Sequence, residues 1–273
     1  MRPSPPTKHP GRAQPRTTSS PRGGIVRQSK RPDGWYPPGP EPAGPGQRED
    51  LWPEKGEDLC FLTGHWRIFQ RVKGHRYSLD DVMTAWYAAD CVKGRDLKHG
   101  LDIGCGIGSV LMMMAWRHLD IPFIGVEAQE LSFGLAQRSL AYNGIEDRVQ
   151  VRNGDLRHPE MVPEGPIFDV ITGTPPYIPV GDGVMSDKEQ CAPCRFELRG
   201  GIEDYCLAAA RLMAPNGRFI VCHSGIERTI AAGDAAGLTT LRYREVIPRH
   251  GRKSLFSLFL MAHAHEHPNH TTT

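Results

Sequence analysis

The chain has 273 residues, a formal net charge of +2, 39% hydrophobic residues and seven cysteines. No window reaches the roughly 18 consecutive apolar residues of a membrane-spanning helix, and no apolar segment follows the basic N-terminus as a secretory signal requires. An odd number of cysteines at irregular spacing fits reduced thiols better than a disulfide framework. We therefore expect a cytoplasmic protein without membrane association.

Residues 1–50 differ in composition from the remainder. They hold 12 of the 24 prolines, and their basic residues outnumber the acidic ones nine to four. The scarce aliphatic side chains cannot bury enough apolar surface to offset the entropy of ordering the segment, so we expect a disordered tail. This tail either binds along the phosphates of a nucleic acid or acts only as a solubilising linker. A transit peptide is disfavoured because frequent prolines prevent an amphipathic helix.

Residues 51–95 are predicted to form an N-terminal extension. The segment Phe69–Tyr77 indicates a hairpin or loop, and a helix follows it to about Ala89. Ser78 is the predicted N-cap of that helix, with Asp81 in the third position of a capping box.

From residue 97 the chain alternates strands with helices, as parallel sheets covered by helices do. Strands are predicted at Leu97–Ile103, Ile121–Val126, Arg148–Arg152, Phe168–Gly173, Arg218–His223, Leu241–Ile247 and Ser254–Ala262. Helices are predicted from Gly108 to about His118, at Gln129–Asn143 with Gly144 as a left-handed C-cap, and at Ile202–Met213. The pattern indicates an α/β fold: a Rossmann-like, seven-stranded, mostly parallel sheet with helices on both faces over residues 96–262. Residues 263–273 would be a flexible, histidine-rich tail.

A glycine-rich loop, Asp102-Ile-Gly-Cys-Gly-Ile-Gly108, follows the first core strand and opens a helix, the context in which such a loop binds a cofactor. Its glycines permit a tight turn and a close backbone approach to a ligand. Glu127 ends the second strand, where an acid can bind a ribose diol. The predicted cofactor-binding residues are Asp102, Gly104, Gly106, Gly108, Glu127 and, after the third strand, Asp155.

The form Asp-x-Gly-x-Gly-x-Gly resembles the class I S-adenosylmethionine-dependent methyltransferases rather than the nicotinamide-binding proteins. That resemblance implies S-adenosyl-L-methionine as the cofactor. Its α-amino group and sulfonium favour a nearby carboxylate such as Asp102, and its adenine amino group would donate to Asp155.

Thr174-Pro-Pro-Tyr177 ends the fourth strand and resembles the Asn/Asp-Pro-Pro-Tyr signature of methyltransferases that act on conjugated amino groups. By that resemblance Thr174 Oγ and the Pro175 carbonyl accept the hydrogens of the substrate amine, Pro176 completes the turn, and Tyr177 stacks on the flat substrate. The sequence departs from that signature at its first position, where Thr174 has one oxygen on a shorter, β-branched side chain in place of Asn or Asp.

The segment Gln70–Asp81 resembles the stretch before the core in the bacterial tRNA(Val) adenine-N6 methyltransferases, and the likeness extends over residues 66–262. It implies that His75, Arg76, Tyr77 and Ser78 lie near the cofactor and the substrate entrance. The expected activity is N6-methylation of an adenine in RNA, with tRNA as the partner. Glutamine-N5 or another small-acceptor N-methylation stays open, as does a catalytically inactive cofactor-binding protein. The oligomeric state is undetermined.

Cys191 and Cys194 form a single pair without a second pair at zinc-ligand spacing, and His263, His265, His267 and His270 fall in the C-terminal tail. Neither group favours a resident metal ion, so no metal site is expected.

Overall fold

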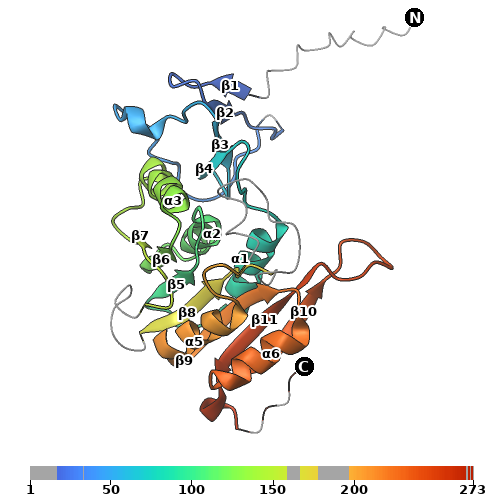
Figure 1. The fold of residues 1–273 in the computed structure, drawn as a ribbon. Coiled ribbons are helices and arrows are strands. Elements are labelled where there is room, and N and C mark those ends of the chain that lie inside the picture. The colour runs from blue at the N-terminus through green and yellow to red at the C-terminus, as the bar shows by residue number, and fades with distance from the viewer. Residues whose placement is uncertain are drawn as a thin grey trace, which may run out of the picture.

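The computed structural model describes residues 17–32, 34–158, 167–177, 197–268, 270 and 272 (Figure 1). A four-stranded sheet of order β1-β2-β3-β4 belongs to the N-terminal part, and a seven-stranded sheet of order β10-β11-β9-β8-β5-β6-β7 forms the core. The small sheet consists of β1 (Thr17–Ser19), β2 (Ile25–Arg27), β3 (Glu57–Phe61) and β4 (Arg67–Arg71). The core strands are β5 (Gly100–Ile103), β6 (Phe123–Glu127), β7 (Val149–Asn153), β8 (Phe168–Gly173), β9 (Met213–His223), β10 (Leu238–Val246) and β11 (Phe256–His263).

Most of the core sheet is parallel. Strands β7, β6, β5, β8 and β9 run in one direction, and β11 pairs antiparallel with both β9 and β10. The predicted seven-stranded, mostly parallel sheet is therefore confirmed.

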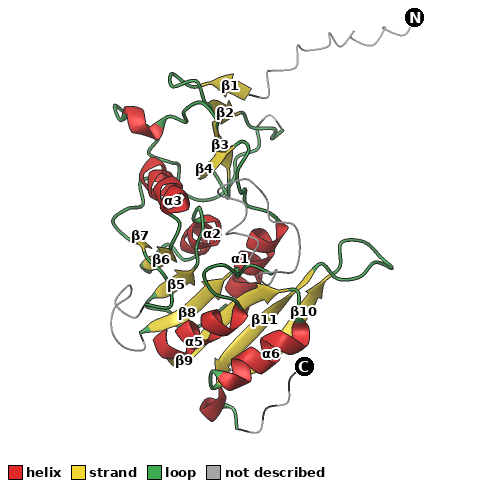
Figure 2. Ribbon diagram, viewed as in Figure 1, coloured by secondary structure: helices red, strands yellow, loops and turns green. Residues whose placement is uncertain are grey.

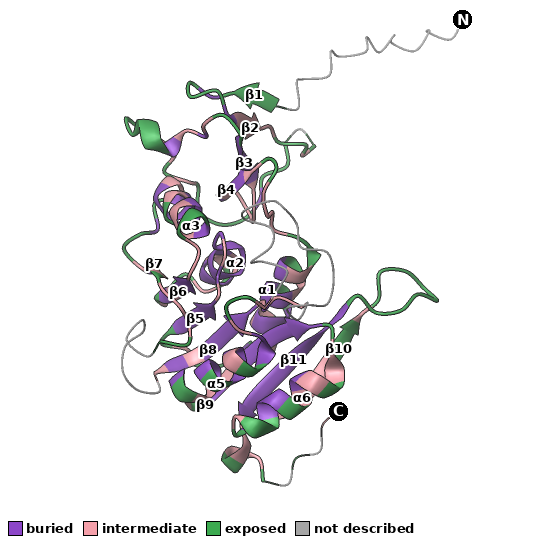
Figure 3. Cartoon of the chain, viewed as in Figure 1, coloured by how far each residue is buried: buried purple, intermediate pink, exposed green. Residues whose placement is uncertain are grey.

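Helices cover both faces of the core sheet (Figure 2). Along β9, Ile220 and Cys222 pack into the hydrophobic cluster shared with helices α1 to α3, whereas Phe219 and Val221 pack into the cluster shared with α5 and α6. The central strands β5, β8 and β11 are consequently buried between two layers of helices (Figure 3), whereas β7 and β10 at the edges of the sheet are partly exposed. The helices are α1 (Leu79–Cys91), α2 (Ser109–Arg117), α3 (Glu130–Asn143), α5 (Ile202–Leu212) and α6 (Ile226–Ala235), with 3-10 turns at η1 (Glu49–Leu51) and η3 (Ala264–Glu266).

Two elements near the end of the core differ from expectation. Strand β9 begins directly after α5, and residues 214–217 bulge out of its pairing with β8. Helix α6 was not predicted because its glycine weakens the helical pattern. A Cβ at Gly233 would meet Met261 Sδ at 3.1 Å, so the glycine allows α6 to lie close against β11.

The expectation of disorder over residues 1–50 is wrong for the described residues from 17 onward. β2 pairs parallel with β3 through Ile25–Asp58 and Val26–Leu59, and β1 pairs antiparallel with β2. Backbone pairing to β3 orders this polar segment without an apolar core of its own. Residues 1–16 lie outside the described residues.

The C-terminal segment also differs from the expected flexible tail. His263 is the last residue of β11, and its Nε2 lies 3.1 Å from the Met213 carbonyl oxygen. Glu266 Oε1 accepts a hydrogen bond of 2.6 Å from the N–H of Asn216. These contacts fasten the start of the segment to β9.

Polar side chains of α3 bind the edge of β4. Ser139 Oγ accepts from the Phe69 N–H at 3.0 Å. Asn143 accepts from the Arg67 N–H at 2.9 Å and donates to the Arg67 carbonyl at 2.7 Å. The helix thus satisfies backbone groups that an edge strand would otherwise leave open, and it joins the small sheet to the core.

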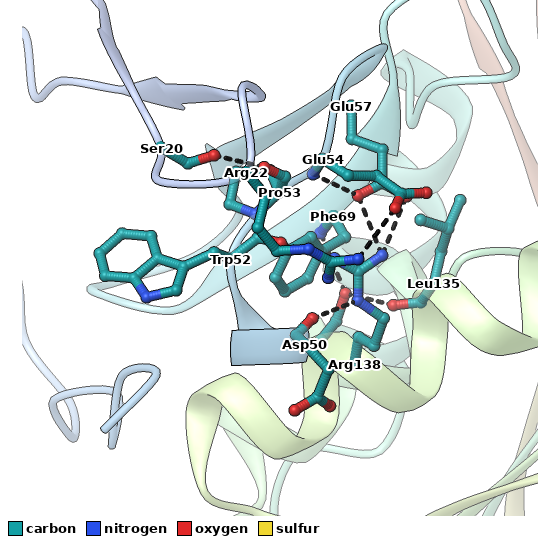
Figure 4. Close-up of polar contacts among 11 residues, drawn as sticks. Ser20, Arg22, Asp50, Trp52, Pro53, Glu54, Glu57, Phe69, Leu135 and Arg138 are labelled. Atoms are coloured by element: carbon teal, nitrogen blue, oxygen red, sulfur yellow. Dashed lines mark hydrogen bonds and ion pairs between the residues drawn. The ribbon is translucent and has the colours of Figure 1, made fainter. Parts of the chain in front are cut away.

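One arginine adds a second connection between α3 and the N-terminal extension (Figure 4). Arg138 Nη1 lies 2.9 Å from both carboxylate oxygens of Glu57, and its other nitrogens donate to the carbonyls of Asp50 and Trp52. Its guanidinium also lies over the Phe69 ring, 4.3 Å from the centroid. Because the Glu57 side chain is 3% exposed, this ion pair is shielded from water.

Replacing Arg138 by methionine is expected to lower the free energy of unfolding by about 3 kcal/mol, since it leaves a buried carboxylate without its cation. Urea denaturation of the two proteins measures the difference. The control is Arg48→Met, which breaks the exposed Arg48–Asp50 pair and should change stability by less than about 1 kcal/mol. Equal effects of the two substitutions would contradict this account.

Candidate functional site

The register of the core sheet brings the predicted motifs together at one edge. Ile103 of β5 pairs with Val126 of β6 on one side and with Gly173 of β8 on the other. The residues that follow, Gly104, Glu127 and Thr174, therefore leave three neighbouring parallel strands at the same level. Ligands of open α/β sheets bind at this carboxyl edge.

A cavity of about 430 Å³ lies at that edge, within the range of small-molecule sites. Eight of the ten predicted site residues line it: Gly104, Gly106, Glu127, Asp155, Thr174, Pro175, Pro176 and Tyr177. Of the four residues expected near the cofactor and entrance, His75, Arg76 and Ser78 line the cavity. Tyr77 instead donates its hydroxyl to the Phe61 carbonyl at 2.9 Å.

The glycine loop exposes its backbone to the cavity. Gly104, Gly106 and Gly108 have φ values of +65°, +56° and +83°, a region that favours glycine. A Cβ at Gly104 would lie 1.9 Å from the Tyr205 hydroxyl, whereas one at Gly106 would meet no atom within 4 Å. Gly108 does not line the cavity; it precedes α2 and packs toward Ala136.

Glu127 is fixed by backbone donors. Its Oε2 accepts from the Gly106 N–H at 2.8 Å, and its Oε1 accepts from the Gln129 N–H at 2.6 Å. Burial raises the pKa of Glu127, and these two N–H groups act in the opposite direction. Each carboxylate oxygen can accept a further hydrogen bond, so the side chain can still receive hydroxyl donors.

Asp155 is held by a neighbour on its own loop. Arg157 Nη2 lies 2.6 Å from Asp155 Oδ2, and the Arg157 N–H donates to Oδ1 at 3.0 Å. This hydrogen bonding lowers the pKa of Asp155, so the carboxylate is ionised at neutral pH. It faces the cavity as an oriented acceptor.

Asp102 lies behind the cavity wall and does not line it. Its Oδ1 accepts from the Thr172 hydroxyl at 2.7 Å, and its Oδ2 is buried with no hydrogen-bond partner among the described residues. Burial raises the pKa of Asp102 to about 7, and the charges of Asp81 and Glu127 act in the same direction. A carboxyl in this position exists in both protonation states near neutral pH.

The segment Thr174–Tyr177 also lines the cavity. Tyr177 packs edge-on against His223, with ring centroids 5.5 Å apart, and its hydroxyl lies 2.9 Å from Cys222 Sγ. Burial raises the pKa of the Tyr177 hydroxyl, so this group is not suited to proton transfer. No hydrogen bond joins the Thr174 side chain to a residue in the described ranges, and the threonine borders the cavity.

Several lining residues were absent from the predicted site, among them Asp80, Asp81, Gln129, Arg199 and Tyr205. Asp81 was interpreted only as a capping residue. It does accept from the Ser78 N–H at 2.8 Å, and it also accepts from the Ser109 hydroxyl at 2.7 Å. The adjacent acids Asp80 and Asp81 could have indicated a binding role. They lie far from the glycine loop in sequence, however, so the sequence did not place them in the same site.

Cys191 and Cys194 lie outside the described residues. Within the described residues, no helix combines the length and apolar character that crossing a membrane requires.

The strand order and the cavity at the carboxyl edge can be compared with known proteins. No protein-family model matches the chain. Among solved structures, P. horikoshii TYW2 in complex with MeSAdo superposes with a TM-score of 0.54 at 15% identity, over 77% of this chain and 72% of that one. The chain has the class I methyltransferase fold.

Sequence comparison supports the narrower resemblance. The tRNA1(Val) (adenine(37)-N6)-methyltransferase of Porphyromonas gingivalis strain W83 is 26% identical over 145 residues, which cover 52% of this chain and 56% of that protein. The protein of the same name from Phocaeicola vulgatus is 30% identical over 160 residues, 58% of this chain and 63% of that protein. The chain thus matches less than two thirds of the length of these relatives. The expected similarity to the tRNA(Val) adenine-N6 methyltransferases is confirmed.

Proposed function

We propose that the chain is an S-adenosylmethionine-dependent N-methyltransferase that modifies N6 of an adenine in RNA, with tRNA as the substrate class. One observation carries the proposal: Thr174–Tyr177 and the glycine loop with Glu127 border the same cavity. The printed names of the matching relatives support the choice of acceptor.

The cavity fits the cofactor in its chemistry. Adenosylmethionine offers an α-amino group, a sulfonium, a ribose diol and an adenine amino group, all of which favour acceptor or anionic partners. The carboxylates that line the cavity are Asp80, Asp81, Glu127 and Asp155. Glu127 would accept the ribose hydroxyls, Asp155 the adenine amino group, and the open backbone at Gly106 allows close approach.

The chain's own residues then prepare the acceptor amine. When bound, the cofactor supplies an electrophilic methyl group on sulfur. Thr174 Oγ and the Pro175 carbonyl accept the two N–H hydrogens of the exocyclic amine, which draws nitrogen from planar toward tetrahedral geometry and frees its lone pair. Transfer of that methyl group would leave the nitrogen with a surplus proton, which would be released to water.

Tyr177 would hold the base by stacking. Its ring is fixed by His223 and by Phe256, whose centroid lies 6.5 Å away. An unstacked base in an RNA loop costs little to place against such a ring, whereas a base within a duplex must first be extracted.

The test is transfer of labelled methyl from adenosylmethionine to RNA that lacks its native modifications, followed by nucleoside analysis. Label in N6-methyladenosine is the expected result. Label in glutamine of a peptide pool, with none in RNA, would replace the proposal by the protein-methylating alternative. Cofactor binding without transfer to RNA, DNA or peptide would indicate an inactive binding protein.

A further inference from the structure

A second hollow lies in the N-terminal part, outside the cofactor cavity. We call it the N-terminal groove; its volume is about 770 Å³. It combines three cationic side chains with two aromatic rings on a surface that belongs to the segment around β2. Its lining residues are Arg27, Gln28, Ser29, Lys30, Arg31, Pro32, Trp35 and Phe61.

Positive charge is concentrated on one ring of this groove. The guanidinium carbons of Arg31 and Arg67 lie 4.7 Å and 3.5 Å from the Phe61 centroid. Arg31 donates to the Gly64 carbonyl, and Arg67 donates to the Arg27 carbonyl at 2.7 Å. Burial lowers the pKa of Arg67, and the charge of Arg31 acts in the same direction. Among the described residues neither arginine has a carboxylate partner, so the pair favours an anionic ligand.

Trp35 gives the groove an exposed stacking surface. The backbone N–H of Trp35 donates a hydrogen bond of 3.1 Å to the Pro32 carbonyl. Gly34, with φ of +79°, precedes Trp35 in this turn. Trp35 is 52% exposed, and the guanidinium carbon of Arg31 lies 5.2 Å from its ring centroid. An indole beside guanidinium groups binds a nucleobase by stacking while the cations bind its phosphates.

One buried carboxylate joins the groove to the cofactor cavity. Asp58, whose side chain is fully buried, accepts from Arg27 at 2.6 Å through one oxygen and from Arg76 at 2.9 Å through the other. Arg27 lines the groove, and Arg76 lines the cavity. A single Arg–Asp–Arg bridge therefore links a residue that lines the groove to a residue that lines the cavity.

We propose that the N-terminal groove binds the single-stranded RNA that flanks the target base, with phosphates at Lys30 and Arg31 and a base stacked on Trp35. The inference rests on the proposed function for the identity of the strand. An acidic peptide would use the cations but would gain little from the indole, which is why the charge and the exposed ring together favour nucleic acid.

The test uses the full chain and a fluorescent single-stranded oligoadenylate, with anisotropy measured over a series of salt concentrations. Trp35→Ala should raise Kd about tenfold, the loss of one stacked base. The double variant Lys30→Gln/Arg31→Gln should raise Kd and reduce the slope of log Kd against log salt by about 1.4, for two released phosphate contacts. Unchanged Kd in both variants would overturn the inference.

Matched controls lie elsewhere on the surface. Trp86 on α1 is 50% exposed, and Arg211 on α5 is also exposed, so Trp86→Ala and Arg211→Gln should leave Kd and the salt slope unchanged. Thermal unfolding of each variant checks that the fold is kept. A polyglutamate competitor that displaces the RNA from the parent, together with no effect of Trp35→Ala, would indicate a site for any polyanion and overturn the base-stacking inference.

Binding and methyl transfer separate this inference from the proposed function. Weakened oligoadenylate binding in the groove variants, without N6-methyladenosine formation by the parent, would uphold the groove and reject the proposed activity. If the groove variants methylate RNA with the same KM for RNA as the parent, the proposed activity is upheld and RNA binding in the groove is rejected.

Discussion

Thr174→Ala is expected to lower kcat for methyl transfer to RNA about 100-fold, because the side-chain acceptor for the amine hydrogen is lost where the transition state needs it. The dissociation constant of adenosylmethionine should stay unchanged, since the predicted cofactor contacts come from Gly104, Gly106, Glu127 and Asp155. Single-turnover kinetics and calorimetric titration of the cofactor measure the two quantities.

Two conservative variants separate this role from a merely structural one. Thr174→Ser keeps a hydroxyl and should retain most of the parent kcat. Thr174→Asn introduces the residue usual in the resembled signature and should equal or exceed the parent for an adenine amine. Turnover by Thr174→Ala at the parent rate would remove Thr174 from the mechanism.

A second large effect concerns pH and Asp102. The pKa of about 7 in the folded chain lies above the value of about 3.9 for an unfolded aspartate, so the unfolded chain loses this proton first as pH rises. The contribution of Asp102 to stability is complete below about pH 4 and is lost as pH rises to about 7, a decrease of about 4 kcal/mol.

Asp102→Asn should remove that decrease, because an amide does not ionise and can still accept from the Thr172 hydroxyl. Urea unfolding at pH 5 and pH 8, without cofactor, should show the free energy of unfolding of the variant, relative to the parent, rising by about 2.5 kcal/mol between the two pH values, because part of the parent's decrease is already present at pH 5. Asp147→Asn at an exposed position is the matched control, with the parent's pH dependence. The same pH dependence in parent and Asp102→Asn would show that Asp102 stays ionised in the fold.

The strand ends at the carboxyl edge of the core sheet were predictable from the sequence. Short apolar runs, followed by a glycine turn, an acid or the Thr-Pro-Pro-Tyr signature, were enough to predict β5, β6 and β8 and the residues that follow them. The carboxyl ends of parallel strands in one sheet lie at the same edge, so the sequence alone predicts that Gly104, Glu127 and Thr174 lie near one another. Their chemical roles remain proposals.

Long-range packing decided the features that the sequence did not predict. Asp80 and Asp81 reach the cavity only because α1 packs beside α2, which brings Ser109 to Asp81. The composition of the N-terminal segment predicted disorder because the segment is polar. Composition contains no information on the pairing of β2 with β3 or on the ion pair between Arg27 and Asp58, which order the segment.

The sequence by itself thus determined the type of fold, the order of its strands along the chain and the motifs at its carboxyl edge, because these depend on local periodicity and turn residues. Only the tertiary structure decided which distant carboxylates share the cavity, that Asp102 does not line it, and that residues 27–32 form part of a groove. Those outcomes depend on contacts between residues far apart in the chain, and a local sequence pattern does not predict the free energy of such contacts.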